Sequence, residues 1–259
     1  MTLTEVRRLI EQLHIRPSKA LGQNFLIDGN ILQIILREAD VRRDETVIEV
    51  GPGLGVLTAE LIERAKHVAA IEKDSRLCAY LRRRFPELDL IESDAIEAPL
   101  PGCDKVVANL PYSISTPMLE RFVEGDVKPR AIVVTLQREV AERLAAQPRT
   151  KDYGALTVFT QLHYHVTVVH IVSRRCFYPS PRIESAIVAL NRRDPRVKLS
   201  EGAPFHKIVR LGFSQRRKML GKLLAEFGAL DPVIARQRAE ELSLDQWISL
   251  ANALRPALA

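Results

Sequence analysis

Strand-like and helix-like segments alternate through the first half of the chain, and this alternation limits the fold more than any other feature of the sequence. Short apolar runs predict strands, and the amphipathic stretches between them predict helices. The predicted strands cover residues 46–50, 68–71, 88–91, 105–108 and 131–136, and the predicted helices cover residues 3–13, 31–39, 55–64, 75–85, 116–123 and 138–146. This order is typical of an α/β fold with a mostly parallel sheet that helices cover on both faces.

The pattern changes in the second half of the chain. Two β-branched stretches, 164–172 and 183–190, are joined by a short connector, which predicts an antiparallel edge to the sheet. Residues 191–195 have the composition of a linker, and the pattern from Pro204 onward is helical, with breaks at Gly228 and Pro232. We therefore predict two domains, an α/β domain over residues 1–194 and a small all-helical domain over residues 195–259.

Three glycines, Gly51, Gly53 and Gly55, lie between a predicted strand and the helix that follows it. Glycine lets the backbone approach a ligand closely, and the start of a helix adds favourable N–H groups. The pattern suits a dinucleotide or S-adenosylmethionine (SAM). A nicotinamide site usually has its third glycine one position later, where this chain has Val56.

Two acidic residues follow the glycine loop at the ends of the next predicted strands. Glu72 lies 21 residues after Gly51 and could accept two hydrogen bonds from ribose hydroxyls. Asp94 follows the third strand and could accept a bond from the cofactor's adenine amine. Either acid alone could be a solvent-exposed residue, but together with the glycine loop they predict a cofactor site.

The sequence Asn109-Leu110-Pro111-Tyr112 follows the apolar run 106–108, which predicts the end of a buried strand. An aromatic ring can stack on a flat base, while an amide oxygen and a proline carbonyl can accept both hydrogens of an exocyclic amine. Such acceptors would favour a pyramidal nitrogen with a localised lone pair. Because the sulfonium carbon of SAM is already activated, orientation of the amine toward it would supply much of the remaining rate enhancement, and no metal would be needed. Taken alone, the four residues could also form an ordinary turn.

The net charge of +6 is concentrated near the C-terminus. Residues 1–194 contain 27 basic and 26 acidic residues, whereas residues 195–259 contain 11 basic and 6 acidic residues. The densest basic cluster there is Arg216-Arg217-Lys218, which follows Phe213-Ser214-Gln215 at the predicted start of a helix. A polyanion such as RNA would explain the excess, and an ordinary solvated helical surface remains an alternative.

Other protein classes find little support in the sequence. It has no run of about 18 apolar residues, as a transmembrane helix requires, and its N-terminus lacks the apolar centre of a signal peptide. The cysteines Cys78, Cys103 and Cys176 form neither a zinc pattern nor a disulfide framework. We therefore expect a cytoplasmic monomer that uses neither a metal nor a membrane.

Six motifs occur in an order that is highly specific as a set. They are Gly22-Gln23-Asn24-Phe25-Leu26, Glu49-Val50-Gly51-Pro52-Gly53-Leu54-Gly55, Asn109-Leu110-Pro111-Tyr112, Gln137-Arg138-Glu139-Val140-Ala141-Glu142-Arg143, Phe177-Tyr178-Pro179-Ser180-Pro181 and Phe213-Ser214-Gln215-Arg216-Arg217-Lys218. With these motifs the chain resembles the KsgA (RsmA) family of small-subunit ribosomal RNA adenine dimethyltransferases, from about Arg16 to the C-terminus.

The resemblance implies a Rossmann-like, SAM-dependent methyltransferase domain followed by a small helical C-terminal domain. It also implies dimethylation of the N6 of two adjacent adenosines near the 3′ end of small-subunit ribosomal RNA, with a role in late assembly of the subunit. The implied SAM-binding residues are Asn24, Leu26, Gly51, Gly53, Glu72, Asp94 and Asn109. The implied catalytic residues, which would hold the target adenine, are Asn109, Leu110, Tyr112 and, on the other face of the base, Phe177. The implied RNA contacts are Arg216, Arg217, Lys218 and Lys222. The chain differs from the family at Gly221, because family members often have a basic residue near this position.

Three other functions remain open at the level of sequence. The first is an antibiotic-resistance type of methyltransferase that acts on large-subunit ribosomal RNA, which the Asn-Leu-Pro-Tyr form and residues 213–218 disfavour. The second is a non-catalytic assembly or transcription factor that binds RNA or DNA, which the intact cofactor motifs disfavour. The third is a nicotinamide oxidoreductase, which Val56 and residues 109–112 disfavour.

Overall fold

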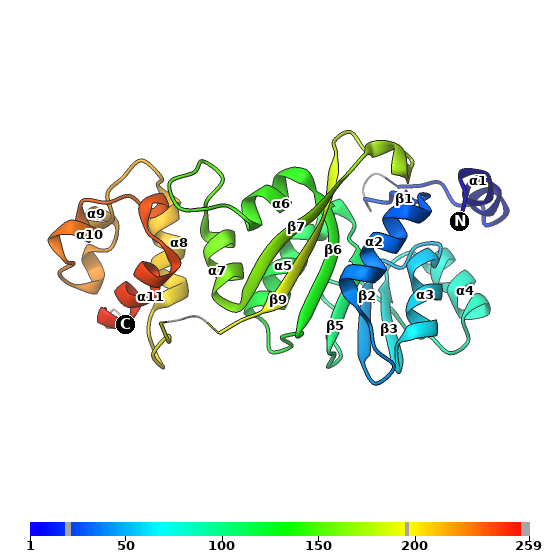
Figure 1. The fold of residues 1–259 in the computed structure, drawn as a ribbon, viewed down its shortest axis with the longest axis horizontal. Coiled ribbons are helices and arrows are strands. Elements are labelled where there is room, and N and C mark those ends of the chain that lie inside the picture. Colours follow the sequence, from blue (N-terminus) through cyan, green and yellow to red (C-terminus); the bar gives the residue numbers. More distant parts are fainter. Residues whose placement is uncertain (19–21, 195–196, 255–259) are drawn as a thin grey trace. The chain divides into compact units, whose positions relative to one another are not determined.

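The computed structural model describes residues 1–18, 22–194 and 197–254, which form two units (Figure 1). The first unit consists of Met1–Ala141 and Thr167–Arg192, and the second of Glu142–Val166 and Arg193–Ala259. The predicted boundary at Asp194 lies close to the third crossing between the units, and residues 142–166 also belong to the second unit. Pro195 of the predicted linker and residues 255–259 of the predicted second domain lie outside the described residues.

The first unit is built on a seven-stranded sheet with the order β4-β3-β2-β5-β6-β9-β7. The strands are β2 Thr46–Val50, β3 His67–Glu72, β4 Asp89–Glu92, β5 Lys105–Asn109, β6 Ala131–Gln137, β7 Tyr164–Val172 and β9 Ser185–Arg192. Strands β2 to β6 pair in parallel, and β9 runs antiparallel to β6 with a register from Ala131↔Asn191 to Gln137↔Ser185. This topology confirms the predicted mostly parallel sheet with an antiparallel edge.

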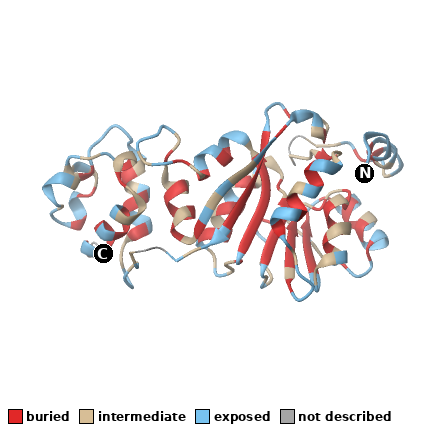
Figure 2. Ribbon diagram, in the orientation of Figure 1, coloured by how far each residue is buried: buried red, intermediate tan, exposed pale blue. Residues whose placement is uncertain are grey.

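Helices α2 (Gly29–Ala39), α3 (Val56–Arg64) and α4 (Ser75–Arg84) pack against one face of this sheet. Their apolar residues form one core with Val47, Val107, Val133 and other sheet residues of the same face. The alternate residues of β5 and β6 are also buried, so both faces of the central strands are covered (Figure 2). The remaining helices that lie wholly or partly in this unit are α1 Leu3–Gln12, η1 Tyr112–Ile114, α5 Ser115–Glu124, α6 Arg138–Leu144 and η2 Arg174–Cys176.

A second, two-stranded sheet joins segments that are far apart in the sequence. Strand β1 (Phe25–Leu26) pairs antiparallel with β8 (Phe177–Tyr178), and Leu26 lies opposite Phe177. The sequence predicts a loop at residues 22–26, because two residues are too few to show the alternation of a strand. The pairing brings the Gly22–Leu26 motif and the Phe177 motif into one place.

Helix α7 (Ala155–His163) in the second unit has no counterpart among the sequence-based predictions. Its sequence contains Thr157, Val158, Phe159 and Thr160 in succession, a composition more typical of strands. All four side chains are buried, so packing within the unit outweighs the intrinsic preference of these residues.

The rest of the second unit is helical, as the sequence predicts. Its elements are α8 Phe205–Ser214, α9 Leu220–Leu223, η3 Ala225–Phe227, α10 Pro232–Ala235, η4 Ala239–Glu241 and α11 Leu244–Ala253. The largest fully buried side chains of this unit are those of Trp247, Tyr153, Tyr164 and Phe205. Gly221 lies against Ala235, and a Cβ at position 221 would stand 3.0 Å from the Ala235 carbonyl oxygen, so a larger residue would force the two short helices apart.

Candidate functional site

A cavity of about 210 Å³ lies at the carboxyl ends of the parallel strands. In open α/β sheets, ligands bind at this edge because the loops that follow neighbouring strands converge there. The cavity gathers nine of the residues predicted from the sequence: Asn24, Leu26, Gly51, Gly53, Glu72, Asp94, Asn109, Leu110 and Tyr112. Gln23 and Glu49 also line it.

The glycine loop forms one wall of the cavity, and its backbone leaves no room for side chains. Gly51 and Gly53 have φ angles of +69° and +58°, which L-residues with a Cβ rarely adopt. A Cβ on Gly51 would lie 2.9 Å from Cγ of Pro111, and one on Gly53 would lie 3.2 Å from the Phe25 ring. The glycines therefore let the loop approach both the segment at residue 25 and the Asn109–Tyr112 turn.

Glu72 ends β3 and is held by main-chain groups. Its Oε1 accepts hydrogen bonds from the N–H groups of Lys73 and Asp74, both at 2.9 Å, and its Oε2 accepts one from Gly53 at 3.2 Å. Burial raises the pKa of Glu72, although these backbone hydrogen bonds oppose the rise. The carboxylate is thus fixed in the cavity wall, and Oε2 keeps room for a further hydrogen bond from a ligand hydroxyl.

Asp94 lies in the loop after β4, within the same cavity. Its Oδ2 forms an ion pair with Lys73 at 2.7 Å, and its Oδ1 accepts a hydrogen bond from the Ile96 N–H at 2.9 Å. The hydrogen bond from Lys73 holds the pKa of Asp94 below its usual value. Asp94 is therefore an ionised acceptor, as a partner for an amine group should be.

Glu49 is a cavity residue whose role the sequence analysis missed. It is 2% exposed, and Thr58 donates a hydrogen bond of 2.6 Å to its Oε2. Burial, and to a smaller extent the nearby charge of Glu72, raises the pKa of Glu49 to about 8, although the Thr58 hydrogen bond opposes this shift. The place of Glu49 in an apolar run before the glycines could have indicated a buried carboxyl. Its raised pKa, however, depends on the tertiary packing around it, which has no local signal in the sequence.

The raised pKa of Glu49 predicts a dependence of stability on pH. Between the ordinary carboxyl pKa and about 8, the folded chain keeps a proton that the unfolded chain has lost. The free energy of unfolding should therefore fall as the pH rises through this range, by about 1 kcal/mol between pH 6 and pH 7. Glu49→Gln replaces the protonated carboxyl with a neutral amide and should remove this slope.

Urea unfolding of both proteins at pH 6 and pH 7 measures the difference. Glu63→Gln is the matched control, because Glu63 is exposed on α3 and its replacement should keep the wild-type slope. A Glu49→Gln protein with the slope of the wild type would show that Glu49 is ionised in the folded state.

Asn109 ends β5 with its side-chain amide oriented by the chain itself. Its Nδ2 donates a hydrogen bond to the main-chain oxygen of Asn24 at 3.0 Å. Its Oδ1 is buried and has no hydrogen-bond partner among the described residues. Buried polar atoms are normally paired, so this oxygen is an acceptor that stands ready for a ligand donor.

The second acceptor in the turn differs from the one the sequence analysis expects. The Pro111 carbonyl already accepts hydrogen bonds from the Ile114 N–H at 3.1 Å and from the Ser115 hydroxyl at 3.2 Å, because these bonds form the start of η1 and α5. The Leu110 carbonyl accepts no hydrogen bond from any described residue. Leu110 therefore supplies the free carbonyl next to Asn109.

The ring of Tyr112 is fixed through its hydroxyl group. The hydroxyl oxygen lies 2.5 Å from Oγ of Ser185, the first residue of β9. Burial raises the pKa of Tyr112, which keeps the hydroxyl protonated, although the hydrogen bond to Ser185 opposes the rise. The ring is thereby held at the cavity wall next to Asn109 and Leu110.

The structure does not bring Phe177 into the cavity wall. Its side chain is 2% exposed and belongs to the sheet core together with Leu26, which it faces across the two-stranded sheet. A contact between Phe177 and a base stays a prediction from the family resemblance.

The basic cluster of the second unit lies in a turn and not at the start of a helix. Helix α8 ends at Ser214, and Arg216, Arg217 and Lys218 follow it before α9 begins at Leu220. The Arg216 guanidinium donates hydrogen bonds to the carbonyl of Lys151, at 2.7 Å, and to the carbonyl of Tyr153. All four basic residues, Arg216, Arg217, Lys218 and Lys222, are exposed, but Arg216 also holds a neighbouring loop.

Neither a metal-binding cluster nor a membrane-spanning helix is found in the described part of the chain. No group of three or more His, Cys, Asp or Glu side chains there is arranged to hold a metal ion. No helix there has the length and apolar character needed to cross a membrane.

Comparisons with known proteins agree on one family. The family model described as ribosomal RNA adenine dimethylase matches residues 15–255. Proteins named ribosomal RNA small subunit methyltransferase A are 36% identical in Clostridium acetobutylicum, over 95% of this chain and 96% of the relative, and 40% identical in Geobacter metallireducens, over 93% and 96%.

Solved structures give the same picture. The crystal structure of a dimethyladenosine transferase from Plasmodium falciparum superposes with a TM-score of 0.77 at 26% identity, over 87% of this chain and 95% of that one. The structure of the 23S rRNA methyltransferase ErmE superposes with a TM-score of 0.68 at 28% identity, over 88% and 98%.

Proposed function

Since the chain belongs to the ribosomal RNA adenine dimethylase family, as its motifs predict, and is a methyltransferase, we propose that it uses SAM to dimethylate adenosines of small-subunit ribosomal RNA. The proposed target is the N6 of two adjacent adenosines near the 3′ end, in the course of late assembly of the subunit. The relatives that share 36% and 40% of their residues with this chain are named for the small subunit, which supports this choice over the large subunit.

One observation carries the chemical part of the proposal. Oδ1 of Asn109 and the carbonyl of Leu110, neither of which has a hydrogen-bond partner among the described residues, belong to the same cavity lining as the glycine loop, Glu72 and Asp94. Groups that suit a methyl donor and groups that suit the target amine therefore line one cavity, which supports the proposed reaction. This arrangement also argues against an RNA- or DNA-binding module without catalysis and against a nicotinamide oxidoreductase.

The residues of the cavity fit SAM as the methyl donor. Glu72 has an oxygen available for ribose hydroxyls, and Asp94 is an ionised acceptor for the adenine amine. Gly51 and Gly53 bring the main chain of the loop close to Pro111 and Phe25 at the cavity wall, where a Cβ would clash. SAM, when bound, supplies an activated methyl group. Calorimetric titration should show binding of SAM and none of NAD, and the opposite result would refute this cofactor.

The residues of the Asn109–Tyr112 turn would prepare the target amine. Oδ1 of Asn109 and the carbonyl of Leu110 would each accept one N–H of the base, which concentrates the lone pair on the nitrogen. The Tyr112 ring, held by Ser185, would stack on the base and fix its plane. Because an adenine amine is a weak nucleophile, orientation and this polarisation are what the protein contributes.

We also propose that the second unit binds ribosomal RNA through phosphate contacts. Residues 195–259 carry five of the six surplus positive charges of the chain, and Arg217, Lys218 and Lys222 are exposed.

The proposed site of action is the cytoplasm, where ribosomal subunits assemble. The proposed active form is a monomer, because residues of one chain line the whole cavity.

Replacing Arg217, Lys218 and Lys222 together by alanine should weaken binding to small subunits about tenfold or more and flatten its salt dependence. Each phosphate contact contributes a slope of about −0.7 to −0.9 in log K against log salt, so the loss of all three should change the slope by about 2. Arg216 is left in place because its replacement would also release the Lys151–Tyr153 loop. The affinity is measured at several salt concentrations.

The control replaces Arg37, Arg43 and Lys66, three exposed basic residues of the first unit, and removes the same charge. SAM affinity should be unchanged in both triple variants. If the two variants gave the same slope as the wild type, the second-unit cluster would have no part in RNA binding.

A further inference from the structure

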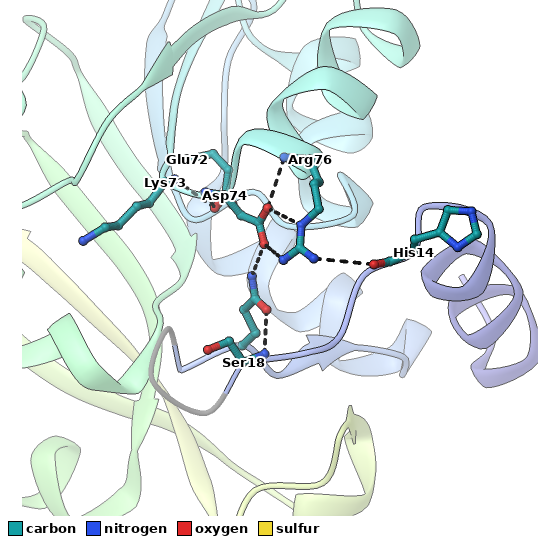
Figure 3. Close-up of polar contacts among 7 residues, drawn as sticks. His14, Ser18, Glu72, Lys73, Asp74 and Arg76 are labelled. Atoms are coloured by element: carbon teal, nitrogen blue, oxygen red, sulfur yellow. Dashed lines mark hydrogen bonds and ion pairs between the residues drawn. The ribbon is translucent and has the colours of Figure 1, made fainter.

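A buried carboxylate residue, Asp74, connects the segment before β1 to Glu72 at the end of β3 (Figure 3). Asp74 is 6% exposed and caps α4, where its Oδ1 accepts the Arg76 N–H at 3.1 Å. The Arg76 guanidinium binds both of its oxygens, Nε at 3.1 Å from Oδ1 and Nη2 at 2.9 Å from Oδ2. The main-chain N–H of Asp74 in turn donates to Oε1 of Glu72 at 2.9 Å.

Gln23 also donates to this carboxylate, at the same oxygen that Nη2 of Arg76 binds. Its Nε2 donates to Oδ2 of Asp74 at 3.3 Å, and its Oε1 accepts the Ser18 N–H at 2.9 Å. The two bonds fix which end of the amide faces which partner, because Ser18 offers a donor and Asp74 offers acceptors only. Gln23 is thus held at both ends of its side-chain amide.

The residue after Gln23 determines how Asn109 presents its amide. The main-chain oxygen of Asn24 accepts the hydrogen bond from Nδ2 of Asn109. A carbonyl can only accept, so Nδ2 must point toward Asn24, and Oδ1 of Asn109 is left for the substrate. The neighbouring Gly22 packs so closely that a Cβ there would lie 2.9 Å from the Tyr112 nitrogen.

We propose that Gln23 is a positioning residue for the methyl-transfer step, which acts by holding Asn24 against Asn109 through its hydrogen bond to Asp74. The inference rests on the proposed function, since it assigns a role within the same site. Gln23 touches neither reacting group in this account. The contrasting possibility is that the cluster around Asp74 only stabilises the start of α4.

Two single substitutions break the contact without removing the helix cap. Gln23→Glu places a carboxylate against Asp74. Asp74→Asn keeps an oxygen that caps α4, because asparagine and aspartate are equally good caps, but turns an amide nitrogen toward Gln23. The double variant Gln23→Glu with Asp74→Asn restores a donor and an acceptor, since the carboxylate introduced at position 23 can still accept the Ser18 N–H.

Single-turnover methyl transfer to undermethylated small subunits at saturating SAM should slow about tenfold in each single variant and recover to within about threefold in the double variant. SAM affinity, measured by calorimetry, should change by a smaller factor than the rate of methyl transfer does. A second measurement needs no substrate: solvent exchange of the Asn109 side-chain amide hydrogens, followed by NMR, should be faster in the single variants and slow again in the double variant.

The matched control is Gln33→Glu, the same substitution at an exposed position of α2, which should transfer at the wild-type rate. Single variants as fast as the wild type, a loss confined to SAM affinity, or a folded double variant that is not rescued would each overturn the inference. A wild-type protein that binds SAM but methylates no subunit would refute the proposed function instead, and the amide exchange would still report on the contact.

Discussion

Asn109→Ala is expected to lower the rate of methyl transfer by about 10²- to 10³-fold at saturating SAM and RNA, the usual cost of removing a preorganised hydrogen-bond partner from an active site. The substitution removes the buried Oδ1 that has no partner among the described residues and that would accept an N–H of the target amine. Because this acceptor acts on the reacting nitrogen, the loss should fall on turnover, with RNA affinity largely kept. Single-turnover kinetics with undermethylated small subunits measures it.

Asn109→Asp is the informative companion to this variant. Aspartate keeps an oxygen at the acceptor position but loses the donor that bonds to the Asn24 carbonyl. Its rate should therefore lie between those of Asn109→Ala and the wild type. If the alanine variant methylated assembled subunits at the original rate, the assignment of Asn109 as the acceptor would be wrong.

Glu72→Ala should weaken SAM binding by about 2 kcal/mol or more, roughly 30-fold, because hydrogen bonds to a charged acceptor are lost. The three main-chain N–H groups that bind the carboxylate would also lose their partner, so the loop around the cavity would be less well fixed. Calorimetric titration with SAM measures the affinity, and thermal unfolding shows whether the variant is folded.

Glu92→Ala is the matched control for this variant. Glu92 lies opposite Glu72 in the register of β3 and β4, and it pairs with Arg82 at 2.7 Å outside the cavity. Its replacement should leave SAM affinity unchanged. A folded Glu72→Ala protein with the affinity of the wild type would remove Glu72 from the cofactor site.

The sequence predicts the central sheet well because local patterns determine it. Strands β2 to β6 are apolar runs bounded by turn residues, and Gly51 and Glu72 stand at strand ends where a parallel sheet brings its loops together. The Asn109–Tyr112 turn, at the end of another strand, meets them in one cavity for the same reason. Nine predicted site residues follow from this topology and the family resemblance.

The features that the sequence does not reveal depend on contacts between distant segments. The pairing of Leu26 with Phe177 and the bond from Gln23 to Asp74 join residues whose proximity has no local signal. The raised pKa of Glu49 depends on enclosure by the folded core. The Pro111 carbonyl accepts a hydrogen bond from Ser115 because α5 begins there, and the exact first residue of a helix cannot be determined from the sequence.

The C-terminal region shows the same limit. Its basic residues suggest an anion-binding surface from charge alone, yet only the structure shows that Arg216 holds a loop through the carbonyls of Lys151 and Tyr153. The close packing of Gly221 against Ala235 explains why this position has no side chain for an RNA contact.

The most direct test of the central claim is methyl transfer from labelled SAM to small and large ribosomal subunits that lack the modification, followed by mapping of the modified nucleotides. We predict four methyl groups per small subunit, two on the N6 of each of two adjacent adenosines near the 3′ end of its RNA, and none on the large subunit. Methylation of large-subunit RNA, methylation at another atom, or no transfer by a protein that binds SAM would contradict the proposed function.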